Sequence, residues 1–356
     1  MGESLFDEFS DLTKKADDIL GYSIKELCLN DPQNLLSQTN YTQPALYVVN
    51  ALTWLKEIST KDKPDFLAGH SLGEYNALFA AGAFDFETGL KLVQERSRLM
   101  SLAKGGAMAA VIGLEKNTIN KIINENKFSK ISIANYNSQD QLVISGLKDE
   151  IEKAKDVFEK AGARLYVILP VSGAFHTHFM QKAKEEFAVF IEEFEFHDLE
   201  IPVISNVTAH EYENDKIKHL LCEQIVSPVK WTDSIRYLMG KGKMEFEELG
   251  PGNVLSNLIK KLKKLPPFKK QETGDKKQEA GDKEKIENMP APEKEKQEKI
   301  TALTLGNADF KKEYGLKYAY IAGAMARGIS SKELVTAMGR AGMMGYYGSG
   351  GQNMEI

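Results

Sequence analysis

The segment at residues 69–73, GHSLG, constrains the fold of this chain more than any other feature of the sequence. It follows a short apolar run at 65–68 and precedes a helical pattern at 74–81. A G-x-S-x-G motif between a strand and a helix is typical of a nucleophile elbow, a strained turn that exposes its serine. The pattern therefore predicts such an elbow. The simpler interpretation is a glycine-flanked turn whose serine only caps the helix.

Ser71 is the residue that this elbow would expose. Side chains at Gly69 or Gly73 would clash in so sharp a turn, so we expect both positions to require glycine. The serine would also lie at a helix N-terminus, where free N–H groups stabilise an oxyanion. The motif therefore predicts Ser71 as a nucleophile and the backbone N–H of Leu72 as a donor to the substrate oxygen.

A serine nucleophile needs a base, and His176 is the best candidate for it. It follows a predicted strand at 164–170 and a glycine turn, at the sheet edge where α/β sites assemble. His178 is the alternative, although a helix that has already begun would turn it elsewhere. His70 is next to Ser71, and the turn should direct its side chain away. The remaining histidines lie in polar segments and are expected on the surface: His197, His210 and His219.

Arg96 is the most informative cation, because it lies between apolar stripes of a predicted helix at 86–100. A cation in that position either extends its head to solvent or pairs with an anion. Arginine is suited to a planar, two-pronged grip on a carboxylate. The residues alone favour the solvent-directed interpretation, and Arg98 is the competing position for an anion contact.

Strand and helix patterns alternate before residue 260, which indicates an α/β fold with a parallel sheet. Within this alternation, residues 107–170 have the order βαββαβ, typical of a ferredoxin-like unit. We expect strands at 107–113, 131–134, 141–145 and 164–170, with helices at 116–125 and 148–161. Further helices are expected at 45–58, 86–100, 177–194 and 230–239, and a further strand at 202–205.

Composition changes sharply after residue 260, where Lys, Glu, Gln and Pro dominate as far as about 299. Such a segment buries too little apolar surface to offset chain entropy, which predicts a flexible linker. The whole chain has 356 residues, 42% of them hydrophobic, and a formal charge of −5. These values argue against a dedicated nucleic-acid binder and against a largely disordered chain.

Several other classes are excluded by what the sequence lacks. No apolar stretch is long enough for a membrane span, and the acidic N-terminal segment is unlike a secretory signal. The only cysteines, Cys28 and Cys222, are far apart, which argues against a disulfide scaffold. Neither they nor the histidines have metal-ligand spacing, so we expect no metal site. The expected location is the cytoplasm.

Many separate blocks, in order from Leu5 to about Lys264, resemble the malonyl-CoA:acyl carrier protein transacylase family. This agreement is far more specific than the elbow alone. The blocks are TQPAL (42–46), GHSLGEY (69–75), AGAFDFETGLKLVQERSRLM (81–100), GAMAAVIGL (106–114), NYNSQDQLVISG (135–146), VSGAFHTHFM (171–180), ISNVTA (204–209), QIVSPVKW (224–231) and ELGPGNVLSNL (248–258).

The resemblance implies a role for each site residue. Ser71 would carry the acyl group, His176 would be its base, and Arg96 would grip the free carboxylate of malonyl, which overturns the solvent-directed interpretation. Gln224 would orient the histidine through its backbone carbonyl, which makes a Ser–His dyad. Asn137 would line the substrate cleft. The AFH sequence at 174–176 resembles the malonyl-selecting form, in which phenylalanine leaves little room for a branched substrate.

The implied fold is an α/β-hydrolase-like acyltransferase core at residues 1–264, with the ferredoxin-like insert at about 106–170. The family's first strand and its glycine-rich loop, which supplies a second oxyanion donor, are expected to be missing. A charged linker would occupy 265–300. Residues 301–356 resemble the start of an FMN-dependent enoyl reductase, too short to complete a flavin-binding barrel.

The implied activity is ping-pong transfer of malonyl from malonyl-CoA to an acyl carrier protein, in polyketide or fatty-acid biosynthesis, without a cofactor. Two alternatives stay open. The same elbow and base could serve a hydrolase that clears stalled acyl groups from carrier proteins, which the tandem arrangement with a reductase favours. An inactive remnant or docking module is the second, which the missing loop favours.

Overall fold

The computed structural model describes residues 1–171, 173–264, 321–322 and 344–345. The chain divides into two compact units, residues 1–273 and 274–356. In the second unit, the described residues form one parallel pair, β7 (Ile321–Ala322) with β8 (Met344–Gly345). The predicted linker and most of the predicted reductase segment lie outside the described residues.

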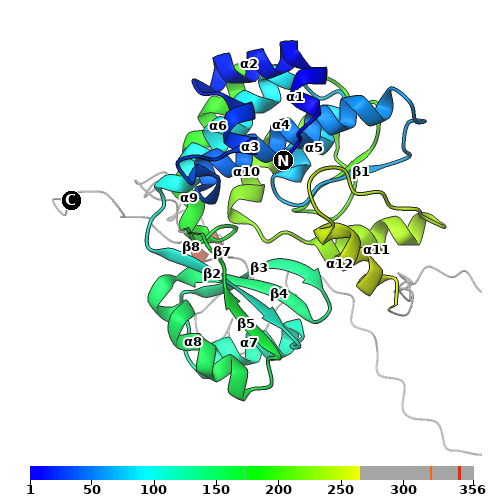
Figure 1. Ribbon diagram of the computed structural model, residues 1–356. Coiled ribbons are helices and arrows are strands. Elements are labelled where there is room, and N and C mark those ends of the chain that lie inside the picture. The colour runs from blue at the N-terminus through cyan, green and yellow to red at the C-terminus, as the bar shows by residue number, and fades with distance from the viewer. Residues whose placement is uncertain (172, 265–320, 323–343, 346–356) are drawn as a thin grey trace, which may run out of the picture. The chain divides into compact units, whose positions relative to one another are not determined.

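The part of the first unit that holds the elbow consists mainly of helices, and it contains a short parallel strand pair. The pair is β1 (Leu67–Ala68) with β6 (Val203–Ile204), so the expected parallel pairing is present. Buried apolar side chains from the helices pack into one large core. The helices are α1 (Leu5–Glu8), α2 (Ser10–Leu20), α3 (Ile24–Leu29), α4 (Thr39–Ile58), α5 (Gly73–Ala80), α6 (Phe86–Leu102), α9 (Gln181–Phe190) and α10 (Ile217–Val226). Figure 1 shows β1 beside α5.

The ferredoxin-like insert has the predicted elements. Its strands pair antiparallel in the order β3-β4-β2-β5, and the helices α7 and α8 pack with the buried face of the sheet into a separate apolar core. Figure 1 shows it as a distinct body beside the helical part. The elements are β2 (Gly106–Ile112), α7 (Lys116–Glu125), β3 (Ile131–Ser138), β4 (Gln141–Leu147), α8 (Lys148–Lys160) and β5 (Leu165–Ile168).

A third apolar cluster joins the C-terminal helices of this unit to β6. The helices are α11 (Trp231–Lys241) and α12 (Val254–Leu262), which lie side by side in Figure 1. Helix α11 also packs on β3 of the insert, and Val229, just before this helix, pairs with Asn135 in the middle of that strand. The insert is therefore tied to the helical part at a point close to the elbow.

Two helix predictions were wrong in extent. The helix expected at 45–58 begins at Thr39, because its polar first turns carry no apolar periodicity, and it keeps Pro44 inside. The helix expected at 177–194 is broken: a 3-10 turn at His178–Met180 precedes α9, and another at Ile191–Glu193 follows it. Two more 3-10 turns lie at Leu35–Ser37 and Asn214–Lys216.

Candidate active site

Ser71 lies in a sharp turn between β1 and α5, as the motif predicted. Its φ is +53°, a left-handed conformation that a residue with a side chain rarely adopts. A Cβ on Gly69 would lie 1.9 Å from the carbonyl carbon of Gly73, so the first glycine is required by close approach. The expected clash at Gly73 is wrong, because a Cβ there meets no atom within 4 Å. The turn brings the backbone of Gly73 close to the position that a Cβ on Gly69 would occupy. A Cβ on Gly73 itself would point into unoccupied space.

Asn206 holds the elbow in this strained conformation. Its Oδ1 accepts a hydrogen bond from the Ser71 N–H at 2.7 Å, and its Nδ2 donates to the Gly69 carbonyl at 2.6 Å. Asn206 is buried and follows β6, the strand that pairs with β1. The two parallel strands therefore deliver the serine and the asparagine to the same edge. Reasoning from the sequence missed this residue, since its only signal was its place in the block at 204–209.

Ser71 and His176 are in direct contact. The Oγ of Ser71 lies 2.8 Å from Nε2 of His176, and Nδ1 of that ring lies 2.9 Å from the Gln224 carbonyl oxygen. A carbonyl only accepts, so Nδ1 carries the ring proton and Nε2 is free to accept from the serine. His176 is 4% exposed, and burial, followed by the positive charge of Arg96, lowers its pKa to about 3. The resting imidazole is therefore neutral.

The Gln224 carbonyl is available to His176 because it lies in the last turn of α10. The final carbonyls of a helix have no partner within the helix, and the helix dipole makes that end negative. This end favours a positive imidazolium when the ring accepts a proton. His176 itself has a φ of +59°, so both partners of the contact are held in strained conformations.

Arg96 is buried at this site and does not reach solvent. It is 1% exposed, its NH2 group donates to Ser71 Oγ at 3.1 Å, and NH1 donates to Oε1 of Gln43. Its Nε has no hydrogen-bond partner among the described residues. The solvent-directed interpretation from the residues alone is wrong, because α6 packs this face against α4 and α5. The competing Arg98 lies on the surface, where it pairs with Glu95.

Glu74 is a buried acid that the sequence reasoning missed. Its carboxylate accepts hydrogen bonds from the Tyr212 hydroxyl, the Gln224 side-chain amide and the Asn206 N–H. Burial raises the pKa of Glu74 to about 7, against the opposing effect of these donors. Gln224 also donates from Nε2 to the Ser71 carbonyl at 2.9 Å and accepts from Arg96 at 2.8 Å. The glutamine thus contacts the base through its backbone and the cation through its side chain.

The other predicted residues lie as follows. Asn137 on β3 contacts Nε2 of His70 through its Oδ1 at 2.8 Å, and the His70 ring lies against Trp231 with centroids 5.5 Å apart. His70 thus points away from Ser71, as expected, and burial lowers its pKa.

Within the described residues the Leu72 N–H donates no hydrogen bond, so it is free for a substrate oxygen. The alternative base and the three expected surface histidines are all exposed: His178, His197, His210 and His219.

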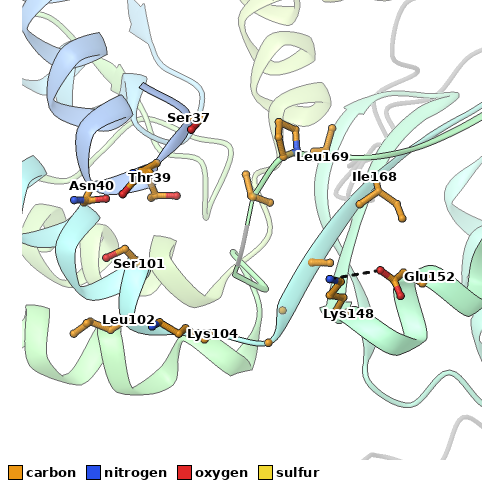
Figure 2. Close-up of a pocket in the computed structure, with 16 residues that line it drawn as sticks. Ser37, Thr39, Asn40, Ser101, Leu102, Lys104, Lys148, Glu152, Ile168 and Leu169 are labelled. Atoms are coloured by element: carbon orange, nitrogen blue, oxygen red, sulfur yellow. Dashed lines mark ion pairs between the residues drawn. The ribbon is translucent and has the colours of Figure 1, made fainter. Parts of the chain in front are cut away.

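A groove of about 880 Å³ lies between the helical part and the insert, and it is separate from this site. Figure 2 shows Thr39 and Ser101 on one side and Ile168 on the other, with the ion pair Lys148–Glu152 at the insert end. None of the side chains around the Ser71 hydroxyl lines it. The chemistry described above therefore belongs to the elbow and not to this groove.

The described part of the chain contains no candidate metal centre and no candidate membrane span. No three His, Cys, Asp or Glu side chains there gather as ligands for a metal ion. No helix there is long and apolar enough to span a bilayer.

Known proteins match both the sequence and the fold. The acyl transferase domain family matches residues 1–304. "Polyketide biosynthesis malonyl CoA-acyl carrier protein transacylase PksC" from Bacillus subtilis is 58% identical over 267 residues, which cover 74% of this chain and 92% of that protein. The crystal structure of malonyl CoA-acyl carrier protein transacylase from Burkholderia pseudomallei is 49% identical with a TM-score of 0.73, and covers 75% of this chain and 94% of that one.

A longer relative matches the whole chain. "Polyketide biosynthesis protein PksE" from Bacillus subtilis is 51% identical over 357 residues. The match covers 100% of this chain, which spans only 46% of that protein.

Proposed function

This chain belongs to the acyl transferase domain family, and on that premise we propose that it is an acyl carrier protein S-malonyltransferase of polyketide or fatty-acid biosynthesis. It takes malonyl from malonyl-CoA and passes it to the phosphopantetheine thiol of an acyl carrier protein. The observation that carries the proposal is the position of Ser71 Oγ, 2.8 Å from a base nitrogen and 3.1 Å from a buried guanidinium. The first contact activates a nucleophile, and the second suits an acyl group that ends in a carboxylate.

In the first half-reaction, Ser71 Oγ attacks the thioester carbonyl of malonyl-CoA while its proton moves to Nε2 of His176. The free Leu72 N–H, at the N-terminus of α5, donates to the oxygen that becomes negative. The C–S bond then breaks, and the CoA thiolate takes the proton from Nε2. The Gln224 carbonyl holds Nδ1–H throughout, so the ring returns to its starting tautomer.

The substrate carboxylate also strengthens the base in this scheme. In the resting site, burial and the charge of Arg96 hold the pKa of His176 near 3, which makes the ring a weak proton acceptor. A malonyl carboxylate on Arg96 cancels much of that positive charge. The pKa of His176 then rises, because the imidazolium no longer faces an uncompensated cation. Binding of the correct acyl group thereby prepares the proton transfer.

In the second half-reaction, the phosphopantetheine thiol gives its proton to Nε2 of His176 and its sulfur attacks the Ser71 ester. The C–O bond breaks, and Ser71 Oγ recovers the proton. Serine, histidine and the two thiols supply all the reacting atoms, so the proposed chemistry requires no cofactor.

Hydrolysis of the same acyl-enzyme is the second candidate. It differs only in the acceptor, which is water in place of a thiol. The tandem arrangement expected from the sequence favours it, and the match to PksE, which covers 100% of this chain and 46% of that protein, is consistent with a longer parent protein. The buried Arg96 favours malonyl transfer, because its guanidinium can bind the carboxylate of a malonyl group. An acetyl group, the kind that a hydrolase would remove, has no carboxylate for it to bind.

For the whole chain, we propose an acyltransferase domain at residues 1–264, a charged linker at 265–300, and the beginning of an enoyl reductase domain at 301–356. The last assignment rests on the sequence resemblance of this segment, and the match to PksE continues through it. We propose the cytoplasm as its location, since malonyl-CoA and acyl carrier proteins are its substrates.

The test is to incubate the protein with malonyl-CoA and a carrier protein bearing the free phosphopantetheine thiol, and in parallel with an acetyl-carrier protein. Intact mass follows acyl loading, release and the acyl-enzyme. We expect malonyl loading, with a malonyl adduct on the enzyme that Ser71→Ala abolishes. Rapid acetyl release without malonyl loading would establish the hydrolase, and neither reaction from a folded protein would overturn both. An adduct that persists in Ser71→Ala would show another nucleophile.

A further inference from the structure

Glu74 lies at the centre of the site, although the proposed chemistry gives it no step. It is the second residue of α5 and is fully buried. One carboxylate oxygen accepts from the Asn206 N–H at 3.0 Å and from the Tyr212 hydroxyl, and the other accepts from Nε2 of Gln224. Every hydrogen bond of this buried acid is therefore fixed by a donor from another part of the chain.

These bonds set the orientation of the Gln224 side-chain amide. A carboxylate only accepts, so Gln224 must turn its NH2 group towards Glu74. Its Oε1 then points the other way and accepts from NH2 of Arg96 at 2.8 Å. If the Gln224 amide were flipped, its NH2 group would face the guanidinium of Arg96, and two hydrogen-bond donors would oppose each other. Glu74, together with the Ser71 carbonyl that accepts from the same Nε2, therefore favours the orientation in which Oε1 of Gln224 meets Arg96.

Arg96 depends on this arrangement for both orientation and charge. Among the described residues, no carboxylate is within ion-pair distance of its guanidinium. Its hydrogen bonds go to the neutral oxygens of Gln43, Gln224 and Ser71. Its guanidinium also lies over the Tyr75 ring, 5.4 Å from the centroid. Burial lowers the pKa of Arg96, and the neighbouring Tyr75 and then the carboxylate of Glu74 oppose this effect. A buried cation without such an acid nearby is costly.

We propose that Glu74 is a positioning residue that orients Arg96 through the Gln224 amide and so gives the site its preference for acyl groups with a free carboxylate. This inference rests on the proposed malonyl transfer and names the residue that supports its selectivity. Glu74 does not touch the reacting atoms. It affects how Arg96 binds the substrate carboxylate. It does not affect His176 in the same way, because the backbone carbonyl of Gln224 holds that ring.

The decisive variant is Glu74→Gln, which keeps the shape but presents NH2 to the NH2 of Gln224. We measure the initial rate and KM of Ser71 acylation by malonyl-CoA and by acetyl-CoA, using intact mass. We expect the malonyl rate to fall about 10- to 100-fold, the effect of losing a hydrogen bond in a charged network, with a raised KM. The acetyl rate should fall at least tenfold less. Glu125→Gln, the same change at an exposed position on α7, is the matched control.

Two further variants separate positioning from a general structural role. Glu74→Asp keeps a charge and only acceptors, so it should retain more malonyl preference than Glu74→Gln. On an Arg96→Ala background, Glu74→Gln should add no further malonyl loss, because the group it positions is already absent. Equal losses on both acyl groups, or full additivity with Arg96→Ala, would overturn the proposal.

A substrate-free measurement distinguishes this inference from the proposed function. If the wild-type protein forms no malonyl adduct, the proposed transfer fails. The unfolding free energies of wild type, Glu74→Gln, Arg96→Ala and the double variant then decide the inference. An interaction energy between the two sites supports the Glu74–Arg96 connection, and additive effects overturn it.

Discussion

Strain at single residues is concentrated where the chemistry would occur. Ser71 and His176 have φ values of +53° and +59°, and each is held by hydrogen bonds from distant segments. Such conformations persist only when their surroundings over-determine them. For Ser71 the restraint is Asn206, and for His176 it is the end of α10. The positions of Ser71 Oγ and His176 Nε2 are therefore fixed by the fold before any substrate binds.

At the same scale, Arg96→Ala should weaken malonyl use selectively. Removing one partner of a buried charged contact costs about 2–5 kcal/mol, so malonyl acylation of Ser71 should fall at least 30-fold. Acetyl acylation should fall much less, since acetyl has no carboxylate to bind. Acyl-enzyme formation by intact mass, with each acyl-CoA in turn, measures both rates. Arg98→Ala, two residues along the same helix and exposed, is the control. Equal losses with the two substrates would show that Arg96 has only a structural role.

At the scale of elements, the elbow depends on one glycine and tolerates a side chain at the other. Gly69→Ala should lower the free energy of unfolding by about 2–3 kcal/mol, because its Cβ would overlap the Gly73 backbone. Gly73→Ala should change it by about 0.5 kcal/mol or less, since a Cβ there meets no atom within 4 Å. Denaturant unfolding of the two variants measures this difference. Similar losses for both would mean that the turn is not held by the close approach of these two residues.

The elements differ in how far the sequence predicted them. The insert followed the predicted order in every element, because its strands and helices carry clear local periodicity and its α7 boundaries match the pattern at 116–125. The break before α9 escaped prediction, because Thr177 caps a 3-10 turn through its own side chain and nothing in the apolar spacing records that bond. The predicted start of α4 was too late, because the polar first turns of this helix carry no apolar periodicity.

At the scale of the whole molecule, two buried groups should shape the pH dependence of stability in opposite directions. His176 has a folded pKa of about 3 against 6.5, so between these values only the unfolded chain binds the proton, and acidification destabilises the fold. Glu74 has a folded pKa of about 7 against 4.5, so the folded state binds the proton between these values, and acidification stabilises it. Between pH 6.5 and 4.5 the two contributions largely cancel.

Substituting either residue should leave the pH dependence of stability that the other residue causes. Relative to wild type, His176→Gln should gain up to about 1.4 kcal/mol of unfolding free energy for each pH unit of acidification from 6.5 to 4.5. Glu74→Gln should lose a similar amount over the same interval. Denaturant unfolding at several pH values between 4.5 and 7.5 gives the three curves. Parallel curves for wild type and both variants would contradict the assigned directions.

The sequence by itself determined the elbow, the insert and the identities of the residues around the Ser71 hydroxyl, the last through family resemblance. The elbow and the insert are encoded locally, in the spacing of glycines and in the periodicity of apolar residues. Only the tertiary structure decided that Arg96 is buried, that Gly73 is unobstructed, and that Asn206 and Glu74 belong to the site. The contacts responsible join residues that are far apart, such as Ser71 with His176, separated by 105 positions, and Glu74 with Gln224, separated by 150. Hydrogen bonds over such distances depend on how the strands and helices pack, and no local pattern records them.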